Sequence, residues 1–352
     1  MKGSHSVKNV AIIGGTGYGA VELIRLLQSH RYMKIKQIIS HSQYGDQITS
    51  VYPHLTEFYD DPMEELNINR LKDEIDVVFL ATPAGVAKDL VPQFQESNVQ
   101  CIDLSGDLRL HAREAYLTWY GKEAAPQEIL DEAVYGLSEI YKEEIIKAKI
   151  ISNPGCFPTS ALLGLLPAVE HGILNNQSIV IDGKTGVSGA GRKQSQMTHY
   201  SETNENVTPY KIGKHQHIPE IDLYLSQVAN EDIATTFTTH LIPMTRGLLC
   251  TMYGKLDKQV STPEVIDLYQ SYYETHPFVR IREEGVFPST KEVYGSNFCD
   301  IGLHVDERTN QLIIGSAIDN LVKGAAGQAI QNANLMNGWD EKHGLYHIPI
   351  FP

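Results

Sequence analysis

The sequence has few of the features that mark proteins stabilised by disulfides or zinc, or proteins that bind nucleic acid. Its four cysteines, Cys101, Cys156, Cys250 and Cys299, are far apart and form no CxxC pair, so disulfides and a bound metal are both disfavoured. Basic residues are in the minority: 29 Lys and Arg against 43 Asp and Glu give a formal net charge of -14. Such a charge repels the phosphate backbone of nucleic acids, which are therefore not expected as partners.

Long hydrophobic runs are also missing. The run 161–169 is interrupted by Gly164 and Pro167 and is far shorter than the ~20 apolar residues that cross a bilayer. Residues Met1 to His5 lead almost directly into an apolar strand, without the long hydrophobic segment of a secretory signal. We therefore expect a cytoplasmic protein with no membrane partner.

The length of 352 residues exceeds that of one typical hydrophobic core and favours two domains. The first half alternates β-branched runs with helical patterns, as over 18–29, and this order is typical of a doubly wound parallel sheet of the Rossmann type. The predicted strands of this half are 9–13, 36–40, 76–81, 100–104 and 149–152.

The second half has longer strands with few helices between them, which predicts an α+β domain with a mixed or antiparallel sheet. A helix is expected over 156–171, and the Gly-rich stretch 183–210 reads as a functional loop or lid. We place the first domain at 1–155 and the second at 156–319. A single amphipathic helix is predicted over 320–335, and we expect the segment 320–352 to return to the first domain. The predicted strands are 179–182, 235–241, 248–255, 278–282, 298–305 and 312–317.

A glycine-rich turn lies between the first predicted strand and the first predicted helix. Gly14 and Gly17 permit a tight turn and close backbone approach, and the helix N-terminus attracts a pyrophosphate. Thr16 and Tyr18 belong to the same turn, and Ala20 takes a position that serves helix packing. A dinucleotide-binding site is therefore favoured over an ordinary turn.

The end of the second strand bears on the choice of dinucleotide. An NAD-preferring site places Asp or Glu there to hold the ribose 2′-hydroxyl, whereas this chain has Ser40, His41 and Ser42. Room for a 2′-phosphate favours NADP as the cofactor, with these three residues as candidate contacts.

Cys156 occupies a position suited to a nucleophile. Pro154 and Gly155 predict a turn just before an apolar helix, so the thiol is expected at a helix N-terminus, whose dipole favours the thiolate. The other three cysteines lie inside apolar strands and read as buried, inert residues.

His215 and His217 form an i, i+2 pair with a carboxylate nearby, which is not a metal-binding pattern. Together with a poised cysteine, one of them is a credible general acid and base, and spacing alone does not choose between the two. Arg109, Arg192 and Arg246 occupy loops where arginine commonly clamps carboxylate or phosphate, although each could equally be a solvated surface charge.

Taken together, these motifs resemble the N-acetyl-γ-glutamyl-phosphate reductases, the arginine-biosynthesis family of the aspartate-semialdehyde dehydrogenase superfamily. The resemblance implies an NADPH-dependent reduction of N-acetyl-γ-glutamyl phosphate to the semialdehyde and phosphate, through a thioester on Cys156 with His217 as acid/base. It further implies a homodimer or homotetramer formed through the sheet of the second domain. Substrate contacts are then expected at Arg109, Asn153 and Arg246, and cofactor contacts at Ser188, Gly189 and Asn297. The matching segments are 14–18, 103–109, 153–159, 186–192, 215–221, 240–247 and 295–298.

Three alternatives stay open from the sequence. The same chemistry could act on N-acetyl-aminoadipyl phosphate or aspartyl phosphate. A cofactor-free Cys-His thiol hydrolase would bind no NADPH, and a nucleotide-sensing protein that kept the fold would have an unreactive Cys156.

Overall fold

The computed structural model describes residues 6–352, so the prediction made for Met1 to His5 lies outside the described residues. Within that range no helix is both long and apolar enough to cross a membrane. The chain divides into two compact units. Unit 1 contains the residues up to Pro154 and Ala325–Tyr346, and unit 2 contains Gly155–Gly324 and His347–Pro352. The final segment therefore divides between the units, whereas we expected all of 320–352 in the first domain.

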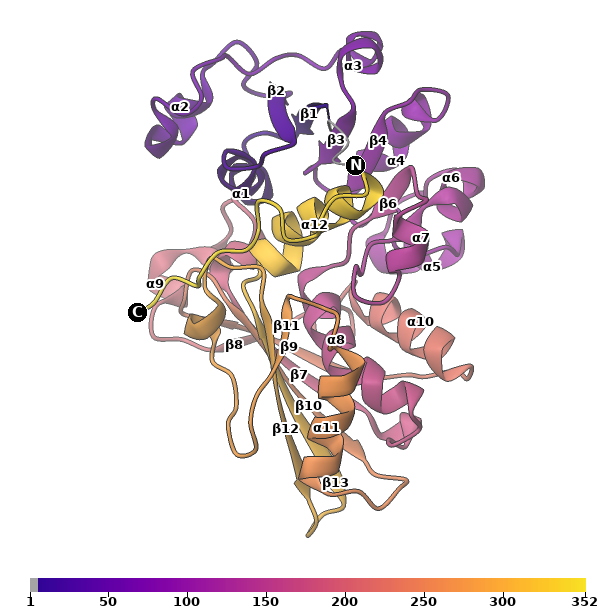
Figure 1. Ribbon diagram of the computed structural model, residues 1–352. Helices are drawn as coiled ribbons and strands as arrows, with labels where there is room; N and C mark the ends of the chain where they lie inside the picture. The colour runs from indigo at the N-terminus through magenta and orange to yellow at the C-terminus, as the bar shows by residue number, and fades with distance from the viewer. Residues whose placement is uncertain (1–5) are drawn as a thin grey trace. The chain divides into compact units, whose positions relative to one another are not determined.

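Unit 1 is built on a six-stranded parallel sheet with the order β2-β1-β3-β4-β6-β5 (Figure 1). This arrangement confirms the predicted Rossmann-type fold. The sequence pattern missed only β5, because two residues carry no periodicity. The strands are β1 (Lys8–Ile13), β2 (Met33–Ile39), β3 (Val77–Leu80), β4 (Gln100–Asp103), β5 (Val134–Tyr135) and β6 (Ile150–Ser152).

The strands β3 and β4 are almost wholly buried, because helices cover the sheet as in other parallel sheets. The order of the strands changes direction at β1, which lies between β2 and β3. Loops that leave β1 and β3 therefore diverge at the carboxyl edge, where α/β sheets bind nucleotides. The helices are α1 (Tyr18–Leu27), α2 (Ile48–Val51), α3 (Ile68–Glu74), α4 (Ala87–Leu90), α5 (Arg113–Tyr120), α6 (Gln127–Glu132), α7 (Lys142–Ile145) and α12 (Gly327–Met336).

Helix α12 packs in unit 1 beside α1 and α7. Amide side chains dominate its contacts: Gln328 Nε2 and Asn332 Nδ2 both donate to the Gly136 carbonyl oxygen, each at 2.8 Å. The single helix predicted over 320–335 is wrong in its first part, where a π-helix covers Val322–Ala326 before α12 begins. The helical period continues through both, so the sequence pattern did not separate them.

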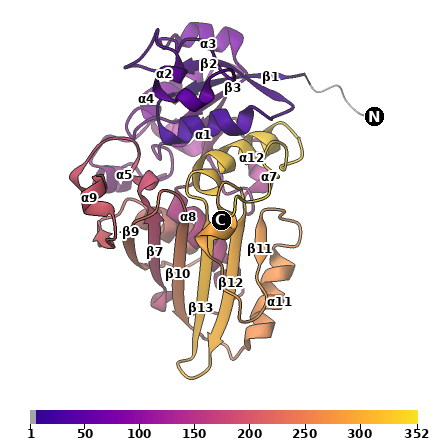
Figure 2. The same ribbon diagram turned by 90° about the vertical axis from the view of Figure 1, so that its left-hand side faces the viewer.

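Unit 2 contains a seven-stranded mixed sheet with the order β11-β12-β13-β10-β7-β9-β8 (Figure 2), as the predicted α+β domain requires. Only β7/β9 and β11/β12 are parallel neighbours. The strands are β7 (Val180–Gly186), β8 (Thr208–Tyr210), β9 (Thr236–Ile242), β10 (Leu248–Lys255), β11 (Val279–Ile281), β12 (Cys299–Asp306) and β13 (Gln311–Ile318).

Helix α8 (Cys156–Glu170) packs on β10 and β13 and is buried on nearly all sides, which its apolar composition requires. A side chain at Gly164 would overlap the Met252 methyl group, so glycine permits close approach of helix and strand. The other helices of unit 2 are α9 (Tyr200–Thr203), α10 (Ile218–Ala229) and α11 (Thr262–Tyr272).

The loop predicted over 183–210 is wrong in its extent. Strand β7 continues through Gly183 to Gly186, pairing with both β10 and β9, and the stretch also contains α9 and β8. Glycine is a poor strand former, so the pattern was read as a loop. In the fold Gly183 is required because a Cβ there would lie 2.8 Å from Cδ1 of Phe157 and closer still to Cε1.

Candidate active site

The glycine turn of unit 1 forms a cradle at the point where the strand order changes. The N–H groups of Gly14 and Gly15 both donate to the Ile39 carbonyl oxygen at 3.0 Å, and Gly17 donates to the Gly14 oxygen at 3.1 Å. Gly14 has φ +92°, and a Cβ there would overlap the Ala81 carbonyl group that follows β3. Only glycine satisfies both conditions.

The N-terminus of α1 continues this cradle. Gly17 is its N-cap, no side chain caps the helix, and its first turn carries no acidic residue. Tyr18 is the first helical residue, and the Thr16 carbonyl oxygen accepts the Tyr52 hydroxyl at 2.9 Å. The first N–H groups of a helix have no partner within it, and with the helix dipole they suit a pyrophosphate, so the residues present fit a dinucleotide.

The end of β2 offers hydroxyl groups and no carboxylate. Ser40 is buried and its Oγ accepts the Gln43 N–H at 3.2 Å, so it shapes the turn. His41 and Ser42 are exposed. Of the predicted contacts here, Ser42 is therefore the one with an accessible hydroxyl.

Arg109 and Asn153 lie together in unit 1, following β4 and β6. Arg109 Nε donates to the Asn153 carbonyl oxygen at 2.9 Å and Nη2 to the Leu104 oxygen at 3.2 Å. The Asn153 side chain donates to the Ala325 oxygen at 3.1 Å and accepts from Asn332 Nδ2 at 3.1 Å. Both predicted substrate contacts are thus held by internal hydrogen bonds, which fix the orientation of each side chain.

Cys156 is the first residue of α8 in unit 2, with Gly155 as the N-cap and no side chain capping the helix. Its position confirms the predicted placement at a helix N-terminus, where the dipole favours a thiolate. Cys156 is partly exposed, whereas Cys101, Cys250 and Cys299 are buried. Burial raises the pKa of the Cys101 and Cys250 thiols to about 12, so both are unreactive near neutral pH.

His217 lies against the turn that carries Cys156. A Cβ built on Gly155 would be 2.8 Å from Cδ2 and Cε1 of the His217 ring and nearer still to Nε2. His217 is the residue before α10, and its backbone N–H donates to His215 Nδ1 at 3.1 Å. The two imidazole rings are 4.7 Å apart between centroids, with the Phe157 ring 5.7 Å from His215 and 6.1 Å from His217.

The two histidines have different chemical environments. Burial, and secondarily the charge of Lys211, lower the pKa of His215 to about 3. His215 is therefore neutral near pH 7, and its Nδ1 is occupied as an acceptor. His215 therefore holds the backbone of His217 through this hydrogen bond, and His217 is favoured as the group that exchanges protons.

The buried neutral His215 predicts a loss of stability in acid. Its folded-state pKa lies below the unfolded value near 6.5, so the unfolded chain takes up a proton first and stability falls as the pH drops from about 6.5 toward 3. In His215→Asn the amide would still offer an oxygen to the His217 N–H. Between pH 7 and pH 5 we expect this variant to lose about 2 kcal/mol less stability than the wild type, by order of magnitude. Urea unfolding at both pH values measures this, and identical pH dependence of the two proteins would contradict it.

Three residues of unit 2 that the sequence reasoning did not select lie beside predicted site residues or the turn that carries them. Glu220 is fully buried in α10 and its Oε1 accepts the Gly155 N–H at 2.8 Å, which ties α10 to the Cys156 turn. Tyr210, in β8, lies near Cys156: burial and then the Cys156 thiol raise the pKa of its hydroxyl. Asp319 pairs with Arg246, with its Oδ2 3.2 Å from Nε. Glu220 stands inside the histidine motif and could have been found there, whereas Tyr210 and Asp319 carry no local signal.

The remaining predicted residues come together in unit 2 around β13. Asn320 donates from Nδ2 to Ser188 Oγ at 2.9 Å, and Gly189 follows Ser188 in the same 3-10 turn. Asn297, two residues before the strand β12, is fully buried. Arg192 lies in an exposed bend. The structure thus brings Ser188, Arg246 and the 295–297 turn to one end of the sheet.

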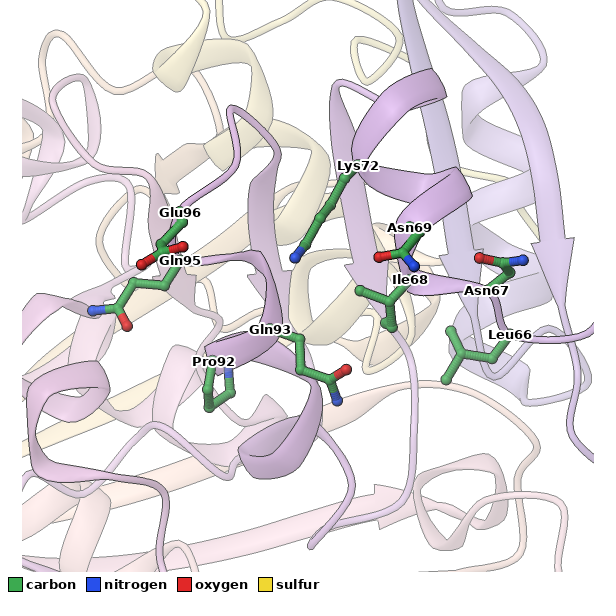
Figure 3. A pocket seen from close by; sticks show the side chains of 9 residues that line it. All are labelled: Leu66, Asn67, Ile68, Asn69, Lys72, Pro92, Gln93, Gln95 and Glu96. Carbon is green, nitrogen blue, oxygen red and sulfur yellow. The ribbon is translucent and has the colours of Figure 1, made fainter.

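The hollow in Figure 3 contains none of these residues. It lies in unit 1 between α3 and the segment after α4, and is lined by Leu66, Asn67, Ile68, Asn69, Lys72, Pro92, Gln93, Gln95 and Glu96.

Two family models match almost the whole chain. Residues 9–148 match the semialdehyde dehydrogenase NAD-binding domain and residues 156–320 the semialdehyde dehydrogenase dimerisation domain. A relative from Oceanobacillus iheyensis named N-acetyl-gamma-glutamyl-phosphate reductase is 61% identical over 98% of this chain and 100% of its own length. The chain belongs to the N-acetyl-γ-glutamyl-phosphate reductases of the semialdehyde dehydrogenase family. This membership confirms the predicted resemblance.

Further comparisons agree with this family. A Bacillus subtilis relative of the same name is 48% identical over 97% of this chain and 99% of its own. Among solved structures, aspartate semialdehyde dehydrogenase II from Vibrio cholerae superposes with a TM-score of 0.72 at 17% identity, covering 94% of this chain and 98% of that one. At such low identity the likeness supports the fold alone. The match of 9–148 identifies unit 1 as the dinucleotide-binding part.

Proposed function

We propose that the protein reduces N-acetyl-γ-glutamyl phosphate with NADPH, giving N-acetyl-glutamate 5-semialdehyde and phosphate, as a cytoplasmic step of arginine biosynthesis. The observation that carries the proposal is the thiol of Cys156 at the N-terminus of α8, beside His217, in a chain whose relatives bear the name of this reductase. An acyl phosphate is electrophilic at its carbonyl carbon, and a thiolate is the nucleophile suited to it.

The first step forms a thioester. The Cys156 sulfur attacks the acyl carbon, a carbon–sulfur bond forms, the bond from that carbon to the phosphate oxygen breaks, and phosphate leaves. The dipole of α8 supports the thiolate before attack. Removal of the thiol proton is the first task of His217, because its Nε2 lies against the Cys156 turn.

The thioester is then open to reduction, since sulfur stabilises a carbonyl group poorly. The nicotinamide cofactor, when bound, supplies the hydride for the acyl carbon. His217 holds the proton that the oxygen of the resulting thiohemiacetal requires and takes it back as the carbon–sulfur bond breaks. The aldehyde leaves, and the Cys156 thiolate is restored.

Binding of the anionic substrate depends on local positive charge, because the chain carries a formal charge of -14. Arg109 and Arg246 are the proposed clamps, with Asn153 as a further substrate contact. Ser188, Gly189 and Asn297 are proposed to contact the cofactor, together with Gly14, Thr16, Gly17 and Tyr18 of the glycine cradle and Ser40 and Ser42 after β2.

The reverse reaction tests the proposal directly. Purified protein is mixed with N-acetyl-glutamate semialdehyde, phosphate and NADP, and absorbance reports NADPH. We expect NADPH formation that requires phosphate and is lost after thiol alkylation. N-acetyl-aminoadipate semialdehyde and aspartate semialdehyde, run side by side, identify the preferred acyl chain, and faster turnover of either would overturn the proposed substrate.

A carboxylate at position 42 is expected to weaken NADPH binding. Ser42 is exposed after β2, so Ser42→Asp would place a negative charge where a 2′-phosphate is proposed to bind. We expect the KM for NADPH to rise roughly tenfold while the KM for NADH changes little. Ser42→Asn, of the same size and uncharged, is the control. Equal effects of Ser42→Asp on both cofactors would contradict a 2′-phosphate site at this position.

We further propose a homodimer or homotetramer formed through the seven-stranded sheet. The match of 156–320 to a dimerisation domain supports this, and so does the face of the sheet away from α8, where Leu249, Thr251 and Tyr253 of β10 are only partly buried. Sedimentation equilibrium decides the oligomeric state, and a single species of monomer mass would overturn the proposal.

A further inference from the structure

Asp319 and Asn320 follow β13 directly, and the pairing of the strands explains what they can reach. Strand β13 is antiparallel to both β10 and β12, so its last residue, Ile318, is opposite Leu248 and Cys299, the first residues of those strands. The segments that lead into β10 and β12 therefore flank the end of β13. These segments contain Arg246 and Asn297.

Asp319 is fully buried and both of its carboxylate oxygens accept. Oδ2 accepts the Gly295 N–H at 2.7 Å and is 3.2 Å from Arg246 Nε. Oδ1 accepts the N–H groups of Leu321 at 2.9 Å and Val322 at 3.2 Å, and Arg246 Nη2 at 3.3 Å. Every partner is a donor, so an amide at this position would direct its own NH₂ group at other N–H groups.

Asn320 joins a third segment to the same point. Its Oδ1 accepts the Gly247 N–H at 2.8 Å, and its Nδ2 donates to Ser188 Oγ. Ser188 follows β7, whose Thr185 is paired with Leu248 of β10. The side chains of Asp319 and Asn320 thus connect three segments: the one that follows β7, the one that precedes β10 and the one that precedes β12.

Arg246 is held on two sides. Asp319 accepts a hydrogen bond from Nη2 and forms an ion pair alongside Nε, and the guanidinium carbon is 5.5 Å from the centroid of the Tyr294 ring. The arginine side chain remains 15% exposed. A guanidinium fixed along one edge has fewer orientations to lose when an anion binds at another.

We propose that Asp319 is a positioning residue that orients Arg246 for the anionic group of the acyl phosphate. The inference rests on the proposed function, since that function makes Arg246 a substrate clamp. Because Asp319 acts through Arg246, removal of the Asp319 carboxylate raises the KM for the substrate. Asparagine does not replace Asp319, because both carboxylate oxygens are needed as acceptors.

A double-mutant cycle tests the functional link. Asp319→Asn and Arg246→Ala are made singly and together, and kinetic constants are measured with N-acetyl-γ-glutamyl phosphate. We expect Asp319→Asn to raise the substrate KM about tenfold, with a smaller change in kcat, and to have little further effect once Arg246 is alanine, because coupled neighbours are not additive. Losses that multiply in the double variant would overturn the proposal.

Asp300→Asn is the matched control. Asp300 is also fully buried and pairs with arginines, lying 2.6 Å from Arg280 Nε and 2.5 Å from Arg282 Nη2, but it is part of β12 on the sheet face opposite Cys299. Loss of a buried Asp–Arg pair destabilises in both variants. A rise in the substrate KM is expected for Asp319→Asn alone. An equal rise in Asp300→Asn would show that the KM changes because the fold is destabilised, and would overturn the positioning role of Asp319.

A second readout is independent of the substrate. In protein labelled with ¹⁵N-arginine, the Nη2–H signal of Arg246, assigned by its loss in Arg246→Lys, is expected to exchange slowly with water in the wild type, where Nη2 donates to Asp319, and quickly in Asp319→Asn. Unchanged exchange would overturn the positioning role. A wild type that binds NADPH but turns over none of the acyl phosphate contradicts the proposed function instead, and the exchange measurement still decides the role of Asp319.

Discussion

Replacement of Cys156 by serine is expected to abolish reduction of N-acetyl-γ-glutamyl phosphate while NADPH still binds. The hydroxyl of serine is far less acidic than a thiol and no ester formed on it would be as open to hydride as a thioester. We expect kcat to fall by about 10⁴-fold or more, the scale seen when an essential nucleophile is removed. The proposed cofactor contacts do not include the thiol, so the NADPH dissociation constant, measured by fluorescence, stays unchanged.

Cys101→Ala is the matched control for this variant. Cys101 is buried in β4 of unit 1 and its raised pKa makes it unreactive, so the control retains activity even if it costs some stability. Alkylation by iodoacetamide is expected to label Cys156 first in the native protein. Activity near the wild-type level in Cys156→Ser would contradict the thioester mechanism.

Replacement of Gly155 by alanine has the second-largest expected effect. Gly155 has φ -69° and ψ 157°, a conformation that alanine adopts without strain, so the expected effect comes from contact alone. The new Cβ would overlap the His217 ring, which is buried and packed near Phe157 and His215. We expect kcat to fall by about 10²-fold or more, because displacement of a general acid/base removes about that much.

Separate measurement of kcat and of the substrate KM identifies the cause of this loss. A displaced His217 lowers kcat and distorts its dependence on pH, whereas the substrate KM changes little. Circular dichroism and the melting temperature report whether unit 2 stays folded. A kcat within twofold of the wild type would show that His217 is not needed at the position the structure assigns to it.

Local sequence patterns predicted most of the fold because they describe interactions between residues close in the chain. Strand β10 was predicted at its observed bounds, Leu248–Lys255, and α8 to within one residue, since each shows continuous apolar character or periodicity. The failures occur where partners far along the chain overrule local preference. Gly183 is part of β7 because the strand pairs with β10 on one side and β9 on the other. The residue is glycine because Phe157 leaves no room for a side chain.

The residues of the candidate site also divide into those that local sequence features predict and those that depend on contacts between distant parts of the chain. Cys156 could be selected from the sequence because Pro154, Gly155 and the apolar run after it define a turn and a helix start, and these are local features. The pair His215 and His217 could not be separated by spacing. Their tertiary surroundings distinguish them, since burial lowers the pKa of His215 while Nε2 of His217 lies at the Gly155 turn.

Short motifs and periodic patterns in the sequence were thus enough to predict the family, the two kinds of sheet and Cys156 as the candidate nucleophile. Only the tertiary structure shows which buried groups contact the candidate site residues. Asp319 meets Arg246, 73 residues earlier, and Glu220 meets Gly155, 65 residues earlier. Such contacts arise from the order and direction of strands and the packing of helices, and no local pattern encodes them.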